Sequence, residues 1–394
     1  MAKGVTVGTK KQHFTFAFTS PLASTDKGQV SFNIGGQGDG FSVVLDNVSL
    51  KEGKASTKPT PKPTGEITLP VEPPGSIAPG EPAPSKPDPT PTPGKPEPTP
   101  APGKPVPGEG PFAQTSGLYV DPESNPAAWV AENKGNPDAE KIQSNIADKP
   151  IARWFGEWSG DIQTATSAYV AAAGDKLPVL VAYNIPGRDC KGHSAGGAGS
   201  PDAYKKWIDG FAAGIGDKPA LVIIEPDALA QLDCFNAEEK KARTELLSYA
   251  VDQLAAKAPN AWTYMDGGNA EWIAPGEMAK RLQSVGVDKI RGFTVNVSNY
   301  FTTEESTKYA NAVNDGLGNK SHYVIDSSRN GKGANGEWCN PGGRQLGEDP
   351  QAGGAGDALL WIKVPGDSDG ACGIAPGAPA GQFDPKLATA LIAG

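Results

Sequence analysis

Two segments of this chain place a carboxylic acid where a run of apolar residues gives way to a polar loop. One reads YNIPGRDCKGHSAGG over Tyr183–Gly197, and the other reads IIEPDAL over Ile223–Leu229. Because each acid follows a strand-like run, we expect Asp189 and Asp227 to project from neighbouring strand ends into one site. Two carboxyl groups held in this way can cleave a glycosidic bond, one as the acid and one to control charge or water.

Seven short apolar runs predict the strands that would position these acids. They cover residues 151–155, 178–183, 220–225, 262–266, 292–297, 323–328 and 359–364. Helical patterns lie between several of them, and the clearest runs from the N-cap Ser200 through Pro201 to the stop signal Gly216. A second helical pattern covers residues 237–259 and opens with acidic residues. This alternation predicts an α/β fold, an incomplete seven-stranded parallel β/α barrel.

Barrel enzymes carry their chemistry at the carboxyl ends of the strands, and polar side chains stand at most of these positions. The residues at or just after the strand ends are Trp154, Asp189, Asp227, Asp266, Asn299, Arg329, and Lys363 with Asp369. Asp and Asn also favour ordinary turns, so any one of them could be a simple turn residue. The aromatic residues nearby favour a sugar site, because aromatic rings stack on the apolar faces of sugars. These are Trp154, Tyr183, Trp272, Tyr300 and Trp338.

The N-terminal part of the chain has a different composition. Residues 53–110 are rich in Pro, Thr, Lys and Glu, which is typical of an extended linker, although PxxP patterns also bind adaptor domains. Residues 14–50 alternate apolar and polar side chains around the turn IGGQGDG, as half-buried antiparallel strands do. We expect residues 1–52 to be a partial, jelly-roll-like β-sandwich, since so few strands cannot close two sheets.

Charge and composition limit the class of partner. The net charge is −9, which disfavours nucleic acid and anionic membranes and fits a neutral polymer better. No stretch approaches the length of a membrane span, and the start MAKGVTVGTKK lacks the apolar core of a secretion signal. Four cysteines together with a Pro/Thr-rich linker are nevertheless typical of secreted proteins, so we expect an extracellular monomer.

The two acidic segments resemble the signatures of glycoside hydrolase family 6, the inverting β-1,4-glucanases that cut cellulose. The blocks MDGGNAEW, TVNVSNY, HYVIDSSRNG, EWCNPGGR and WIKVPGDSDG match further family blocks in the expected order, so the resemblance covers residues 111–394. It implies a distorted barrel of seven parallel strands. The segment GFSVVLDNVSLKEG resembles the end of a carbohydrate-binding module of the family 4 and 9 type.

The resemblance assigns catalytic roles by position. Asp227 corresponds to the general acid, and Asp189 is the neighbour whose charge raises the pKa of that acid. Tyr183 matches the tyrosine that crowds the sugar at the cleavage point. Asp369 matches the carboxylate proposed as base, a role that could also operate through a chain of waters.

The resemblance also implies a set of sugar-binding residues. Trp154, Trp272 and Trp338 match stacking platforms, and Lys363 and Asp367 match groups that bind sugar hydroxyls. Asp266, Asn269 and Asn299 lie in the matching blocks and complete the predicted substrate-binding set. Asn269 stands where the family has His, and Asp367 where Glu is common, so we expect altered subsite affinity.

The four cysteines allow three connectivities. Cys190 and Cys234 each follow an acidic signature, while Cys339 and Cys372 bracket the last strand, so their positions favour these two sequential pairs. The family pairs them in the same way. Free thiols of a cytosolic enzyme are the alternative.

Three functions remain open at this stage. We expect an endo-β-1,4-glucanase that needs no cofactor, because three histidines cannot build a His-rich metal site and no complete phosphate loop is present. A cellobiohydrolase of the same family would need longer loops to roof the site. A catalytically silent polysaccharide-binding protein would not need the acidic set.

Overall fold

A computed structural model describes residues 110–394, which belong to a compact unit spanning Gly94–Gly394. The partial β-sandwich predicted for residues 1–52 and the linker predicted for residues 53–110, apart from Gly110, lie outside the described residues. Both therefore stay predictions. Among residues 110–394, no helix is both long and apolar enough to cross a membrane.

The described residues form one curled sheet of eight strands, in the order β1-β2-β3-β4-β5-β6-β8-β7. The strands are β1 (Arg153–Phe155), β2 (Val179–Ala182), β3 (Ala220–Ile224), β4 (Ala261–Asp266), β5 (Gly292–Val295), β6 (His322–Asp326), β7 (Gln351–Ala352) and β8 (Ala358–Leu360). Neighbours from β1 to β6, and β6 with β8, pair in parallel, so each predicted apolar run overlaps one parallel strand.

The expected count of seven strands was wrong by one. Strand β7 is an additional, two-residue strand that pairs antiparallel with β8 at the edge of the sheet. Its residues Gln351 and Ala352 are exposed, so no apolar alternation marks them in the sequence. The two sides of the sheet meet next to β1 and β8, where Ala152 donates its backbone N–H to the carbonyl of Trp361 at 2.9 Å. Apart from this bond and an isolated parallel bridge between Ile151 and Trp361, no strand pairing joins β1 to β8 within residues 110–394, so the barrel is incomplete, as expected.

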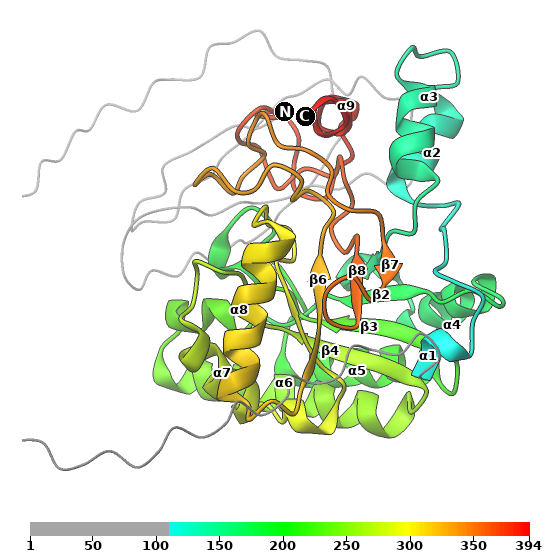
Figure 1. Ribbon diagram of the computed structural model, residues 1–394. Helices are drawn as coiled ribbons and strands as arrows, with labels where there is room; N and C mark the ends of the chain where they lie inside the picture. The colour runs from blue at the N-terminus through cyan, green and yellow to red at the C-terminus, as the bar shows by residue number, and fades with distance from the viewer. Residues whose placement is uncertain (1–109) are drawn as a thin grey trace, which may run out of the picture. The chain divides into compact units, whose positions relative to one another are not determined.

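Helices surround the curled sheet, as Figure 1 shows for α4 to α8. The α-helices are α1 (Gly110–Ala113), α2 (Asn125–Glu132), α3 (Ala139–Ile142), α4 (Ile162–Ala172), α5 (Pro201–Ile215), α6 (Ala237–Lys257), α7 (Pro275–Ser284), α8 (Thr303–Gly316) and α9 (Pro385–Ala393). The predicted cap of α5 is confirmed, because Ser200 Oγ accepts a hydrogen bond from the N–H of Ala203 at 3.1 Å. Gly216, with φ of +58°, ends this helix as predicted.

Successive side chains along a strand point alternately to the two faces of the sheet, and each face has its own apolar cluster. This alternation determines which side chains point toward the site. In β2, Leu180 and Ala182 pack against the helices in the larger cluster. Val179 and Val181 belong to a second cluster inside the curled sheet, and Tyr183 continues that series. Tyr183 therefore lies at the end of the inner face of the sheet, next to the loops that follow the strands.

Candidate active site

A cleft of about 1080 Å³ opens at the carboxyl ends of the parallel strands. All predicted catalytic and substrate-binding residues except Asp266 line this cleft. They are Trp154, Tyr183, Asp189, Asp227, Asn269, Trp272, Asn299, Trp338, Lys363, Asp367 and Asp369. These side chains come from the carboxyl ends of all seven parallel strands, as expected for a barrel enzyme.

Asp227 lies in the turn after β3, three residues beyond Ile224, and has φ of +69°, a left-handed conformation that is uncommon outside glycine. Its carboxyl group accepts no hydrogen bond from residues 110–394 that would favour the ionised form. Burial first, and then repulsion from Asp266 and Asp189, raise the pKa of Asp227 well above its usual range. The group therefore keeps its proton at a pH where an ordinary aspartate has lost it.

Asp266 belongs to the substrate-binding set expected from the sequence. This side chain is 1% exposed and does not line the cleft. Its Oδ2 accepts the backbone N–H of Asp227 at 2.9 Å and that of Gly268 at 3.2 Å. Asp266 therefore fixes the backbone of Asp227, because the last residue of β4 turns its side chain toward the loop after β3.

Asp189 lies in the loop after β2, also in a left-handed conformation with φ of +57°. Its Oδ2 accepts hydrogen bonds from the N–H and Oγ–H of Ser194, and its Oδ1 accepts one from Gln231. The Ser194 hydroxyl also lies 3.0 Å from the hydroxyl of Tyr183. These contacts hold the carboxylate and the tyrosine in one network beside Asp227, as the sequence predicts for neighbouring strands.

Asp369 is held by two positive charges. Arg329 Nη1 donates to its two oxygens at 3.1 and 2.9 Å, and Lys363 Nζ lies 3.0 Å from Oδ1. The N–H of Asn340 and the hydroxyl of Tyr300 also donate to Oδ2. Burial alone would raise the pKa of Asp369, but Arg329 and Lys363 outweigh it and hold that pKa at about 2. Asp369 is therefore ionised at any pH well above 2 and is a weak proton acceptor.

Two buried carboxylates support the site and were not predicted from the sequence. The first, Glu225, is completely buried and accepts the backbone N–H groups of Asn184 and Ile185 at 3.0 Å. It thereby fixes the start of the loop that carries Asp189 to the end of β3. A glutamate directly before the acid is a visible signal, but its inward orientation follows from a φ of +47° that the sequence does not reveal.

The second supporting carboxylate, Asp326, binds backbone groups at the ends of three strands. It is fully buried and accepts backbone N–H groups from Ser298, Ser328, Ile362 and Lys363 at 2.9 to 3.2 Å. These donors follow β5, β6 and β8. Asp326 therefore fixes the backbone beside Lys363, which contacts Asp369.

Three tryptophans give the cleft apolar surfaces. The indole N–H of Trp154 donates to the carbonyl of Ile362 at 2.8 Å, and its ring meets that of Tyr183 edge-on at 5.0 Å. Trp272 and Trp338 are 41% and 56% exposed. Large exposed rings in a cleft are unusual for a packing role and suit stacking against sugar rings.

Polar residues between these rings complete the lining. Asn269 is mostly buried, and its Oδ1 accepts the N–H of Glu271 at 3.2 Å. Asp367 receives a hydrogen bond of 2.8 Å from Asn125 on Oδ2, while its buried Oδ1 has no partner within residues 110–394. Burial raises the pKa of Asp367 to about 7.

The two disulfides join the pairs predicted from the sequence, Cys190 with Cys234 and Cys339 with Cys372, with Cα–Cα distances of 6.1 and 5.9 Å. The first ties the loop after β2 to the short helix Ala230–Cys234 that follows the acidic signature of β3. The second ties the segment after β6 to the loop after β8 that carries Asp369. Each disulfide therefore anchors a loop with a catalytic candidate.

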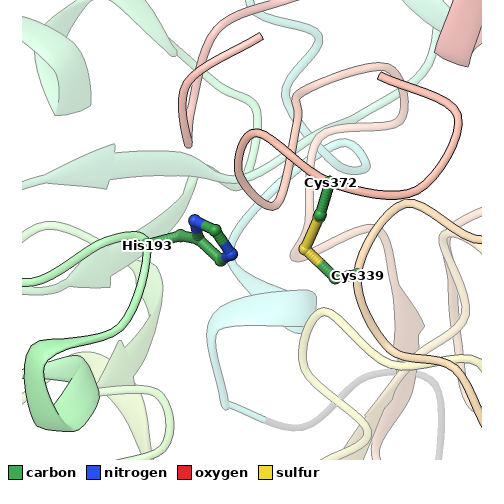
Figure 2. A group of neighbouring side chains, drawn as sticks. All are labelled: His193, Cys339 and Cys372. Atoms are coloured by element: carbon green, nitrogen blue, oxygen red, sulfur yellow. A yellow bond between two sulfur atoms is a disulfide. The ribbon is translucent and has the colours of Figure 1, made fainter. Parts of the chain in front are cut away.

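His193, in the loop after β2, lies close to the second disulfide. Figure 2 shows the imidazole of His193 facing the Cys339–Cys372 bond, and its nearest ring nitrogen and both sulfurs lie within 4.8 Å of one another. The ring also lies 6.0 Å from that of Trp338. Because the two sulfurs are bonded to each other, this group offers no thiolate for a metal ion. His193 instead connects the loops of Asp189 and Asp369.

Comparison with known proteins agrees with this geometry. Residues 113–394 match the family model for glycosyl hydrolases family 6, and the chain belongs to that family. It is therefore a glycoside hydrolase.

Individual relatives are similar over the same region. Endoglucanase 1 of Streptomyces halstedii is 51% identical over 291 residues, which cover 72% of this chain and 91% of that protein. Endoglucanase A of Cellulomonas fimi is 45% identical over 283 residues, covering 70% of this chain but only 60% of the relative. Among solved structures, the endoglucanase Cel6 of Mycobacterium tuberculosis in complex with methyl-cellobiosyl-4-deoxy-4-thio-β-D-cellobioside has 40% identity and a TM-score of 0.67. That match covers 72% of this chain and 99% of that one.

Proposed function

We propose that this protein is a secreted, inverting endo-β-1,4-glucanase that hydrolyses internal bonds of cellulose. One observation carries the proposal: a single tryptophan-lined cleft holds Asp227, whose pKa is raised, together with Asp369, whose pKa is lowered. The environments of the two carboxyl groups shift their pKa values in opposite directions. A glycosidase can therefore use Asp227 as the proton donor and Asp369 as the charged partner.

The chemistry follows from these two states. Asp227 donates its proton to the glycosidic oxygen as the bond breaks, and the leaving sugar departs as an alcohol. The ionised Asp369 stabilises the positive charge that develops on the sugar ring. Water then attacks the anomeric carbon from the opposite face, and its proton leaves toward bulk solvent through other waters, since Asp369 accepts protons weakly. Attack from the opposite face inverts the configuration.

The open cleft favours attack within a chain. Between Trp338 and β8 the polypeptide contains only the two-residue strand β7, and Trp272 and Trp338 remain exposed to solvent. A cellobiohydrolase would need longer covering segments, and this is the alternative.

Viscometry tests the endo assignment. Wild-type protein acting on carboxymethylcellulose should lower viscosity steeply while few reducing ends have formed, because random internal cuts shorten chains most. Cellotriose and cellotetraose should accompany cellobiose at early times. A fall in viscosity proportional to reducing sugar, with cellobiose as nearly the sole product, would support the cellobiohydrolase instead. No release of reducing sugar at all would support a silent binding protein.

Product stereochemistry tests the inverting mechanism separately. Proton NMR of fresh products should show the α-anomer first. An initial β-anomer would contradict inversion without affecting the assignment of substrate. Secretion is proposed from the two disulfides, which persist in oxidising compartments.

A further inference from the structure

Trp158 is an exposed aromatic side chain in the wall of the cleft. Trp158 lies in the short 3₁₀ helix Glu157–Ser159 that follows β1, and it lines the cleft. It is 55% exposed, about as much as Trp338. Burial of an indole ring stabilises a fold, so leaving this one in solvent has a cost that packing does not explain.

The ring of Trp158 is nevertheless held in place. The guanidinium carbon of Arg188 lies 5.2 Å from the ring centroid, a cation–π contact. On another side the ring lies against Gly156, where a Cβ atom would come within 2.4 Å of it. Glycine at this position therefore leaves the space that the ring occupies.

Arg188 is itself fixed by several partners. It is 5% exposed, pairs with both carboxylate oxygens of Glu157, and donates from Nε to the carbonyl of Ser194 at 2.9 Å. Its guanidinium also lies 4.8 Å from the ring centroid of Tyr183. A rigid support of this kind lowers the entropy lost when a ligand stacks on the ring.

We propose that Trp158 is a further stacking platform for a glucosyl unit, in addition to Trp154, Trp272 and Trp338. The inference rests on the proposed glucanase function and extends it. Trp158 and Trp154 both come from the end of β1, and Arg188 connects Trp158 to Tyr183. The platform therefore lengthens the binding cleft on the wall formed by β1 and the loop after β2, and it binds only glucans long enough to reach it.

Calorimetric titration of a non-hydrolysing protein tests this directly. In an Asp227→Ala background, cellotriose and cellohexaose are titrated with and without Trp158→Ala. With Trp158→Ala we expect the dissociation constant for cellohexaose to rise about tenfold, which is the size of one lost aromatic contact. The dissociation constant for cellotriose should change less than twofold. Trp158→Tyr should restore most of the affinity. Ile374→Ala, which removes an exposed apolar side chain that does not line the cleft, is the matched control.

The outcomes separate a binding role from a structural one. Equal weakening for both oligosaccharides, or a lower melting temperature with Trp158→Ala, would mean that the ring only shields the Arg188–Glu157 pair, and would overturn the proposal. Unchanged cellohexaose affinity would also overturn it. If instead the wild-type protein neither binds nor cleaves β-1,4-glucans, the glucanase function itself fails, whatever Trp158 does.

Discussion

The backbone N–H of Asp227 donates a 2.9 Å hydrogen bond to Oδ2 of Asp266, a buried carboxylate at the end of the neighbouring strand β4. The proposed acid is therefore held through its backbone, which leaves its carboxyl group free for a proton and a substrate oxygen. The same Asp266 oxygen accepts the N–H of Gly268, so two strand ends share one support.

Asp266→Ala should lower kcat on cellulose by about a hundredfold, because displacement of a catalytic group by an ångström has effects of this order. KM should change little, since Asp266 does not line the cleft. Asp266→Asn keeps an acceptor for the N–H of Asp227 and should retain more activity than Asp266→Ala. Steady-state kinetics of the two variants checks this. Equal losses of kcat, or a rise in KM alone, would contradict a positioning role.

Lys363→Met should move both limbs of the pH profile to higher pH. Burial has the largest effect on the pKa of Asp227 and on that of Asp369 and changes little, but Lys363 lowers both values. Without this charge the acid Asp227 loses its proton at a higher pH, which moves the alkaline limb upward. Asp369 likewise becomes protonated at a higher pH, which moves the acidic limb upward.

The measurement is kcat/KM for a soluble oligosaccharide across the pH range, with Lys386→Met as the control. Lys386 is an exposed lysine on α9 outside the cleft. Limbs that move apart, or an alkaline limb that moves to lower pH, would show that Lys363 does not act on these two carboxyl groups.

Arg329→Met should destabilise the fold by about 3 kcal/mol, because it removes one of the two cations that pair with the buried carboxylate of Asp369. Arg329 is 3% exposed. The folded-state pKa of Asp369, about 2, lies below the value of about 3.9 expected when unfolded. The stabilisation is therefore present above about pH 4 and is lost as the pH falls through the folded value. Denaturant unfolding at pH 6 should show the full loss, and an unchanged free energy of unfolding there would refute it.

The sequence predicts the parallel strands and most of the cleft because these depend on local patterns. Each strand is a buried apolar run, and each run ends in a polar loop whose position the barrel topology sets. Tyr183, Asp189 and Asp227 therefore come together as expected. Strand β7 was missed because two exposed residues paired at a sheet edge leave no periodicity.

The supporting residues could not be predicted because their roles depend on contacts between distant segments. Asp326 binds backbone groups that follow three different strands, and nothing near it in sequence indicates this. Asp266 looks like its neighbours at strand ends, yet its side chain turns inward. Trp158 contacts Arg188, which lies in another loop, and nothing near Trp158 in sequence indicates this contact.

Replacing Cys339 and Cys372 by serine should reduce stability by about 3–4 kcal/mol, as expected for a cross-link across a 33-residue separation. Activity should also be lost at a lower temperature than global unfolding, because Asp369 lies in the loop that the bond anchors. Activity and circular dichroism followed over the same temperature ramp check this. Coincident transitions would contradict local loosening, and peptide mapping that links Cys190 to Cys339 would contradict the pairing itself.

The most direct test of the account is the dependence of an Asp227→Ala variant on the leaving group. Loss of general acid catalysis should lower turnover of cellulose by about 10²- to 10⁴-fold, because the sugar alcohol cannot leave without a proton. A cellobiosyl fluoride or dinitrophenyl cellobioside needs no such proton and should keep most of the wild-type rate, while the exposed control Asp202→Ala should change neither. If the variant loses activity equally on cellulose and on the activated substrates, Asp227 is not the acid.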